Sequence, residues 1–111
     1  MSEDIWGEVL SVAFKAYRDR DYQKALEYFK QAADMGDAMA YGMLGFMYKN
    51  GEGVEKDYQK AIEYYQKAAD MGDAMACFNL GSMYYVGVGV EKDLQKAEEY
   101  FKKARELGVD C

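Results

Sequence analysis

The side chains that could do chemistry in this chain are carboxylates, tyrosines, serines and two cysteines, because histidine is absent. Without an imidazole, general acid–base catalysis would depend on the 20 Asp and Glu residues. These acids are scattered over repeated segments and helix ends, and their spacing assembles no pair of nucleophile and base. Glu52 and Glu55, which stand near glycine-rich loops, are expected to be solvated surface acids. We therefore predict no catalytic residue and no enzyme activity.

The two thiols, Cys77 and Cys111, do not suggest a metal site. A structural zinc ion needs about four nitrogen or sulfur ligands, which this chain does not offer. We predict neither a metal nor a cofactor. A disulfide between Cys77 and Cys111 fits the cysteine count, but two free thiols are expected in a chain without an export signal.

Two glycine-rich stretches, GEGV at 51–54 and GVGV at 87–90, resemble part of a phosphate-binding loop. A phosphate loop would continue with Lys and Ser or Thr and would follow a strand. Here both stretches follow predicted helices, and Val54 and Val90 are not followed by that pair. We interpret the glycines as turn residues that adopt positive φ angles.

Composition limits the class of protein and of partner. The 111 residues are 50% apolar and 31% charged, which is typical of one globular domain. A net charge of −6 argues against nucleic acid, which requires clustered cations. Apolar runs are too short to cross a membrane, and the acidic start MSEDIWGEVL is unlike a secretory signal. The expectation is a cytoplasmic protein without membrane contact.

A long internal repeat dictates how these side chains are positioned. Residues 21–56 recur as 57–92 with 25 of 36 positions identical, a period typical of helical arrays. Proline is absent, and Ala, Glu and Lys are abundant, which favours helices. Asp21, Asp57 and Asp93 are predicted N-caps, while Gly36 and Gly72 are predicted to end helices.

These start and stop signals predict six helices, at about 4–19, 22–35, 37–50, 58–71, 73–86 and 94–107. Short connections make neighbouring helices antiparallel. The expected fold class is all-α: an α/α solenoid of three antiparallel helical hairpins within a single domain, 1–111. Residues 1–36 would form a capping hairpin, and 37–72 and 73–111 would form two further repeats.

The repeat also resembles a known family, the Sel-one-like repeats, which are related to tetratricopeptide repeats. The resemblance covers about 37–107 and rests on the pattern A-x3-LG-x-MY-x2-G-x-GV-x-KD-x-x-KA. One copy consists of Ala40, Leu44, Gly45, Met47, Tyr48, Gly51, Gly53, Val54, Lys56, Asp57, Lys60 and Ala61. The second copy runs from Ala76 to Ala97. The first hairpin departs from this pattern, because AFKAYRDRDYQKA at 13–25 lacks the double-glycine loop and looks like a tetratricopeptide turn.

The resemblance implies an adaptor or scaffold that binds proteins. A secreted branch of the family carries paired cysteines, but the position paired with Cys77 is Ala69 here, so that framework is missing. Members of that branch are linked to penicillin binding or β-lactamase activity. Such chemistry needs an S-x-x-K motif, and Ser11 and Ser82 are followed three residues later by Phe14 and Tyr85. The activity is therefore not expected here.

The first helix of each predicted hairpin should line the concave side of the solenoid. One stripe per helix is expected to form a peptide-binding groove, aromatic and methionine-rich towards the C-terminus and basic towards the N-terminus. Its residues are Lys15, Arg18, Met39, Phe46, Lys49, Met75, Phe78, Ser82 and Tyr85. Periodicity does not decide between groove and core for Phe46, Phe78 and Tyr85. Met43, Met47 and Met83 are expected in the core.

The expected partner is a protein or an apolar peptide with an acidic end that faces the basic residues. An alternative is self-assembly into a homo-oligomer, because Ala97, Tyr100, Phe101 and Ala104 on the last helix have no following helix to cover them. A further alternative is a designed or truncated fragment of a longer solenoid with no ligand of its own.

Overall fold

The structure, a computed structural model, describes residues 5–108, which form six α-helices and no strand. In chain order these are α1 (Ile5–Arg18), α2 (Tyr22–Asp34), α3 (Ala38–Asn50), α4 (Tyr58–Asp70), α5 (Ala74–Val86) and α6 (Leu94–Glu106). The predicted all-α class is confirmed, and the predicted helix bounds agree with the observed ones to within one or two residues.

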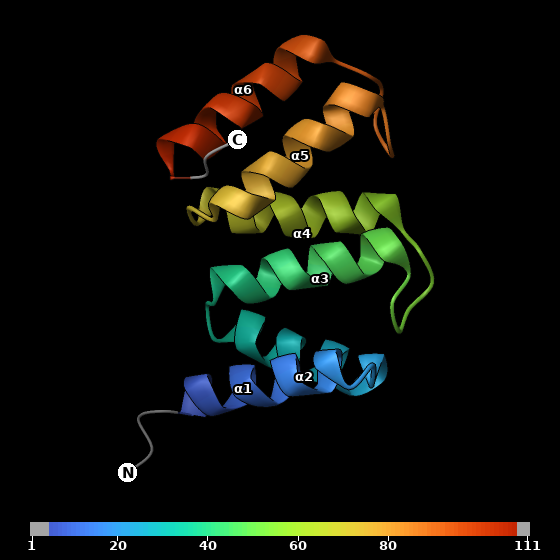
Figure 1. Ribbon diagram of the computed structural model, residues 1–111, viewed down its shortest axis with the longest axis vertical. Coiled ribbons are helices and arrows are strands. Elements are labelled where there is room, and N and C mark those ends of the chain that lie inside the picture. Colours follow the sequence, from blue (N-terminus) through green and yellow to red (C-terminus); the bar gives the residue numbers. More distant parts are fainter. Residues whose placement is uncertain (1–4, 109–111) are drawn as a thin grey trace.

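The helices pair into hairpins that stack along one axis of the molecule (Figure 1). Helix α1 packs on α2, α3 on α4 and α5 on α6, while successive hairpins meet through α2 with α3 and α4 with α5. The molecule measures 47 × 30 × 21 Å. Because each helix packs mainly against its neighbours in the chain, the architecture is an α-solenoid.

Aspartates begin five of the six described helices. The side chains of Asp21, Asp57 and Asp93 accept hydrogen bonds from backbone amides three residues onward. Asp37 accepts in the same way from the amide of Ala40 at the start of α3, and Asp73 accepts from the amide of Met75, two residues onward, at the start of α5. Each carboxylate satisfies an amide that the first helical turn leaves unpaired, and its charge suits the positive end of the helix. The predicted caps are confirmed.

The glycine-rich stretches are turns between the two helices of a hairpin. Gly51 and Gly53 have φ angles of 67° and 79°, which side chains with a Cβ rarely adopt. Gly53 also lies against Tyr22, where an added Cβ would approach the Cβ of Tyr22 to 2.8 Å and its carbonyl carbon to 2.9 Å. The loop therefore packs onto the start of α2 in the preceding hairpin, and its glycines have a structural role.

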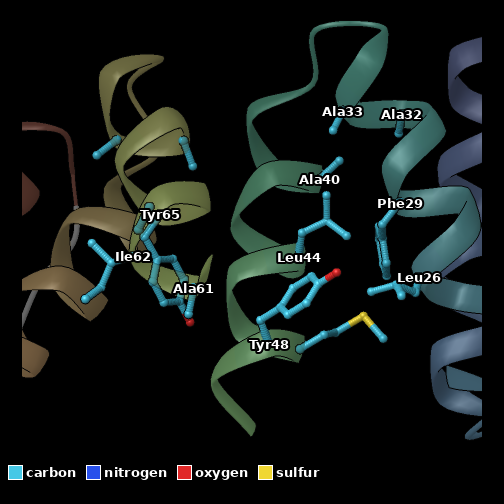
Figure 2. Close-up of a cluster of buried hydrophobic side chains, with 14 of the residues drawn as sticks. Leu26, Phe29, Ala32, Ala33, Ala40, Leu44, Tyr48, Ala61, Ile62 and Tyr65 are labelled. Atoms are coloured by element: carbon cyan, nitrogen blue, oxygen red, sulfur yellow. The ribbon is translucent and has the colours of Figure 1, made fainter. Parts of the chain in front are cut away.

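The core lies between consecutive helices and is made of alanines and a few large side chains. Figure 2 shows Leu26 and Phe29 on α2 directed towards Leu44 and Tyr48 on α3. Phe29 is 0% exposed and Leu44 is 1% exposed. Full burial of each such side chain contributes about 1.5–3 kcal/mol to folding. Met47 and Met83 are buried here as expected, whereas Met43 is only half-buried.

Glycine within the first helix of a hairpin lets its partner helix approach closely. A Cβ at Gly45 would lie 2.9 Å from the Tyr65 ring and 3.1 Å from the carbonyl oxygen of Ala61. Gly81 has the same relation to Phe101. The aromatic side chain of the second helix thus lies directly across the backbone of the first.

The residues of α1 that are equivalent to those of α3 differ by one position from the equivalence expected from the sequence. The amide of Asp21 donates to the carbonyl of Ala16, and the amide of Asp57 donates in the same way to Tyr48. Ala16 and Tyr48 are therefore equivalent, which makes Tyr17, not Arg18, the counterpart of Lys49. One residue along a helix turns a side chain by about 100°. The basic residues of α1 consequently lie on a different face from the one expected.

The apolar residues of α6 face inward. Ala97 and Ala104 are 1% and 0% exposed, and Tyr100 stacks on Tyr84 of α5. The outward positions that carry Ile62 and Ala69 in α4 carry Glu98 and Arg105 in α6, 36 residues later. Nη2 of Arg105 and Oε2 of Glu98 are 3.4 Å apart. Of the apolar residues expected to be uncovered on α6, Ala97 and Ala104 are therefore buried and Tyr100 and Phe101 are half-buried, although Leu94 at the start of the helix is 54% exposed.

Between residues 5 and 108, no helix combines the length and the apolar character needed to cross a membrane.

Candidate functional site

A hollow of about 570 Å³ lies where α1, α3 and α5 meet, and we call it the central groove. Its lining comes from these three helices, from one residue of α4 and from the cap of α5. The lining residues are Tyr17, Met39, Gly42, Met43, Phe46, Tyr65, Asp73, Met75, Ala76 and Asn79. The volume falls in the range of ligand-binding sites.

The walls of the groove are apolar and adaptable. Met39 and Met75 are 52% and 56% exposed, and Phe46 is half-buried between them and the core. Methionine has three rotatable bonds and a polarisable sulfur, so it fits partners of irregular shape. Exposed methionine and phenylalanine in one hollow favour contact with an apolar segment of another molecule.

Gly42 opens the middle of the groove. A Cβ at this position would lie 2.7 Å from Oδ2 of Asp73, so the carboxylate rests against the backbone of α3. Oδ1 of Asp73 accepts a hydrogen bond of 3.3 Å from the amide of Met75. Burial raises the pKa of Asp73, hydrogen bonds from the backbone of Met75 and Ala76 oppose this, and the charge of Asp37 adds to it.

Tyr65 lies at the base of the groove and is 1% exposed. Its hydroxyl oxygen is buried and has no hydrogen-bond partner among the described residues. Burial raises the pKa of Tyr65, and the charge of Asp73 raises it further. A buried hydroxyl without a partner costs about 1–3 kcal/mol, so its presence requires an explanation.

The other tyrosine of the groove differs in this respect. The hydroxyl of Tyr17 donates a hydrogen bond of 2.9 Å to Oε1 of Glu52. Burial and this bond raise the pKa of Tyr17. Glu52 is half-buried and bonded, so the expectation that it is a solvated acid was wrong, whereas Glu55 is exposed. The bond ties α1 to the loop that follows α3.

The structure brings together three of the nine residues predicted for a groove: Met39, Phe46 and Met75. Lys49 and Ser82 line a separate depression of about 280 Å³ beside Lys56 and Val88. The ammonium group of Lys49 lies 5.6 Å from the centre of the Phe46 ring, at the boundary between the two hollows.

The four remaining residues lie outside the central groove. Lys15 forms an exposed ion pair of 3.1 Å with Asp19, and Arg18 is exposed on the same helix. Phe78 is half-buried against Phe101, with ring centres 5.4 Å apart, and Tyr85 is 57% exposed. The groove thus has no basic end, and its single charged lining residue among those described is Asp73.

The described residues contain no group of three or more side chains that could hold a metal ion. Cys77 is fully buried as a free thiol, and burial raises its pKa, so it is a core residue and not a nucleophile. Cys111 lies outside the described residues, so the expected free thiol at this position and the alternative of a disulfide with Cys77 also lie outside them.

Comparison with protein families identifies the repeat. The Sel1 repeat model matches residues 16–37, 38–73 and 74–109 of this chain. The first match includes part of α1 and all of α2, where the sequence pattern departs from the other two copies.

Two curated relatives from Helicobacter pylori share part of the sequence. "Putative beta-lactamase HcpE" is 39% identical over 57 residues, which are 48% of this chain and 16% of that protein. "Putative beta-lactamase HcpC" is 36% identical over 56 residues, which are 50% of this chain and 19% of that protein. The matches therefore span less than a fifth of these relatives.

Solved structures share the fold over more of the chain. A Sel1 repeat protein from Oxalobacter formigenes has a TM-score of 0.83 at 32% identity, covering 87% of this chain and 40% of its own. The protective antigen c5321 of uropathogenic Escherichia coli, described as displaying an SLR fold, has a TM-score of 0.84 at 31% identity, and the match covers 97% of this chain and 24% of that one. Cysteine rich protein B of Helicobacter pylori has a TM-score of 0.76 at 28% identity, and the match covers 99% of this chain and 96% of that one.

Proposed function

Because the chain belongs to the Sel1 repeat family, we propose that it is a protein-binding module that holds an apolar peptide segment in the central groove. Sel1 repeats are generally scaffolds for protein–protein interaction and generally not enzymes. The peptide as ligand and the groove as its site are the specific parts of the proposal.

The observation that carries the proposal is the exposed methionine pair over an otherwise apolar hollow. Met39 and Met75 are each more than half exposed, although the repeat buries Met47 and Met83 efficiently. Leaving this surface uncovered costs about 25 cal/mol for each Å² that a partner could bury. An extended or helical segment with apolar side chains would cover it.

A hydrolytic activity has less support. The relatives whose names contain β-lactamase match about half of this chain and less than a fifth of their own length. Ser82 is half-buried beside Lys49 and Lys56, but the S-x-x-K spacing is absent because Tyr85 stands three residues after it. Ser11 is likewise followed by Phe14.

Self-assembly through α6 also has less support. Ala97 and Ala104 are buried, and Glu98 and Arg105 place charges on the outer face. A helix with a polar outer face resembles the capping end of a solenoid rather than an interface between copies.

The test is selection of a phage-displayed random peptide library on the immobilised wild-type protein, followed by binding measurements with the selected peptides. Gly42→Phe should fill the hollow with the side chain found at the equivalent position 78. We expect this change to weaken peptide binding at least about tenfold, because the ring occupies the volume that the peptide needs and displaces the carboxylate of Asp73, which lies against Gly42.

Ser82→Phe is the matched control, since it adds the same ring in the neighbouring depression. Helix content measured by circular dichroism should stay near that of the wild type in both variants. Selected peptides that bind Gly42→Phe as tightly as the wild type would exclude the central groove as the site. Failure to select any peptide would argue against peptide binding itself.

A further inference from the structure

We propose that the base of the central groove recognises one basic side chain, lysine or arginine, through the carboxylate of Asp73 and the hydroxyl of Tyr65. This inference rests on the proposed function and adds the chemistry of the peptide. It differs from the sequence-based expectation of a partner with an acidic end.

The carboxylate is available for such a partner. Oδ1 of Asp73 caps α5, while Oδ2 lies against Gly42 of α3 within the groove lining. The ion pairs found among the described residues join Lys15 with Asp19 and Arg105 with Glu98. Among residues 5–108, Asp73 therefore has no cationic partner, although it is half-buried, where an unpaired charge is costly.

The hydroxyl of Tyr65 supplies the second group. It is an oxygen with both a donor and an acceptor function, it is buried at the base of the groove, and no described residue satisfies it. The equivalent residues of the other two hairpins are Phe29 and Phe101, which pack in the same place without a hydroxyl. Packing alone thus requires the ring and not the oxygen.

The charge around the groove suits a cation. The net charge of the chain is −6, and Asp73 is the single charged residue among the described residues of the groove lining. An ammonium or guanidinium group would donate hydrogen bonds to both oxygens. Met39 and Met75, which are exposed and flexible, would move aside and pack on apolar side chains beside the basic residue.

The test uses a phage-displayed library of random peptides on four forms of the whole chain: wild type, Asp73→Asn, Tyr65→Phe and Asp37→Asn. Peptides selected on the wild type should contain one Lys or Arg flanked by apolar residues. Synthetic copies should lose about tenfold in affinity for Asp73→Asn, because a hydrogen bond between charged groups is lost. For Tyr65→Phe we expect a loss of about threefold to tenfold.

Asp37→Asn is the matched control, because it removes one equal charge outside the groove lining and keeps an N-cap oxygen. We expect it to change affinity less than about threefold. Replacing the basic residue of the peptide by norleucine should weaken binding to the wild type and leave little further effect of Asp73→Asn.

The outcomes separate this inference from the proposed function. Peptides that lack basic residues, but lose binding on Gly42→Phe, would overturn the basic-side-chain inference and support the groove. Equal losses for Asp73→Asn and Asp37→Asn would also overturn it, since general charge would then explain the effect. Absence of any selected peptide would overturn both.

Discussion

The second and third hairpins, α3–α4 and α5–α6, have the same backbone design and different surfaces. In both, a glycine at 45 or 81 admits an aromatic ring from the partner helix. The neighbouring positions differ, because Gly42 and Phe46 in α3 become Phe78 and Ser82 in α5. The small residue opens the groove in one hairpin, and a ring fills the corresponding space in the other.

The aromatic residue of the second helix shows the same contrast. Tyr65 is 1% exposed at the base of the groove, whereas Phe101 is half-buried against Phe78. Exchange of a few side chains on a constant framework therefore decides whether a hairpin has an open hollow or a filled one. Each prediction below changes one side of this comparison.

The largest effect is expected from removing the two aromatic side chains. Tyr65→Ala should lower the free energy of unfolding by about 3–5 kcal/mol, because it leaves a cavity in a fully buried site. Phe101→Ala should cost less, about 2 kcal/mol, since its ring is partly exposed. Urea denaturation followed by circular dichroism measures both. Equal losses would show that the two sites are buried alike in solution.

Replacing only the hydroxyl of Tyr65 by hydrogen should change the free energy of unfolding in the opposite direction. Tyr65→Phe is expected to raise the free energy of unfolding by about 1 kcal/mol, because the buried oxygen has no partner in the free protein. Tyr17→Phe should lower it by about 1 kcal/mol, because it removes the bond to Glu52. Thermal unfolding of the two variants distinguishes them. Destabilisation by Tyr65→Phe would mean that the hydroxyl is satisfied, for instance by ordered water.

Asp73 predicts a dependence of stability on pH. Burial raises its pKa in the folded protein, despite the amides of Met75 and Ala76, and Asp37 adds to the shift. The folded state thus binds this proton more tightly than the unfolded chain, so the group favours folding more as pH falls through its folded pKa. Asp73→Asn should be more stable than the wild type at pH 7, by a margin that shrinks towards pH 3.8. Urea titrations at several pH values test this, and a margin that grows on acidification contradicts it.

The smallest effect on stability is expected at the outer face of α6. Glu98→Ile with Arg105→Ala recreates there the outer face of α4 and removes an ion pair whose side chains are 69% and 50% exposed. Loss of this pair should change the free energy of unfolding by less than about 0.5 kcal/mol. The new apolar patch should cause association, visible as concentration-dependent light scattering. A variant that scatters light like the wild type at every concentration would show that polarity at these two positions does not control assembly.

Much of the architecture could be predicted from the sequence, because its signals are local. Aspartate before an apolar period and glycine after it mark helix ends wherever they occur, and the 36-residue repeat multiplies them. The groove was harder to predict, because its residues come from three hairpins. No motif around Asp73 or Tyr65 marks either residue as part of a groove. Their proximity depends on how hairpins stack, which no local pattern encodes.

One available signal could have improved the groove prediction. The two other hairpins carry Phe29 and Phe101 where the second carries Tyr65, so the lone hydroxyl was visible in the alignment of the repeats. The face of α1 could not be inferred in the same way, because its connection to α2 differs in length from the others. Lys15 and Arg18 were assigned from a stripe that this difference displaces by one residue.

The unequal connections have a practical consequence for engineering. Residues 19–21 join α1 to α2, whereas 51–57 and 87–93 join the helices of the later hairpins. Transplanting the longer linker into the first hairpin, together with one inserted or deleted residue in α1, would rotate the side chains of α1 about the helix axis. Linker length thus decides which side chains of a helix face the concave surface, so this surface could be redesigned one hairpin at a time.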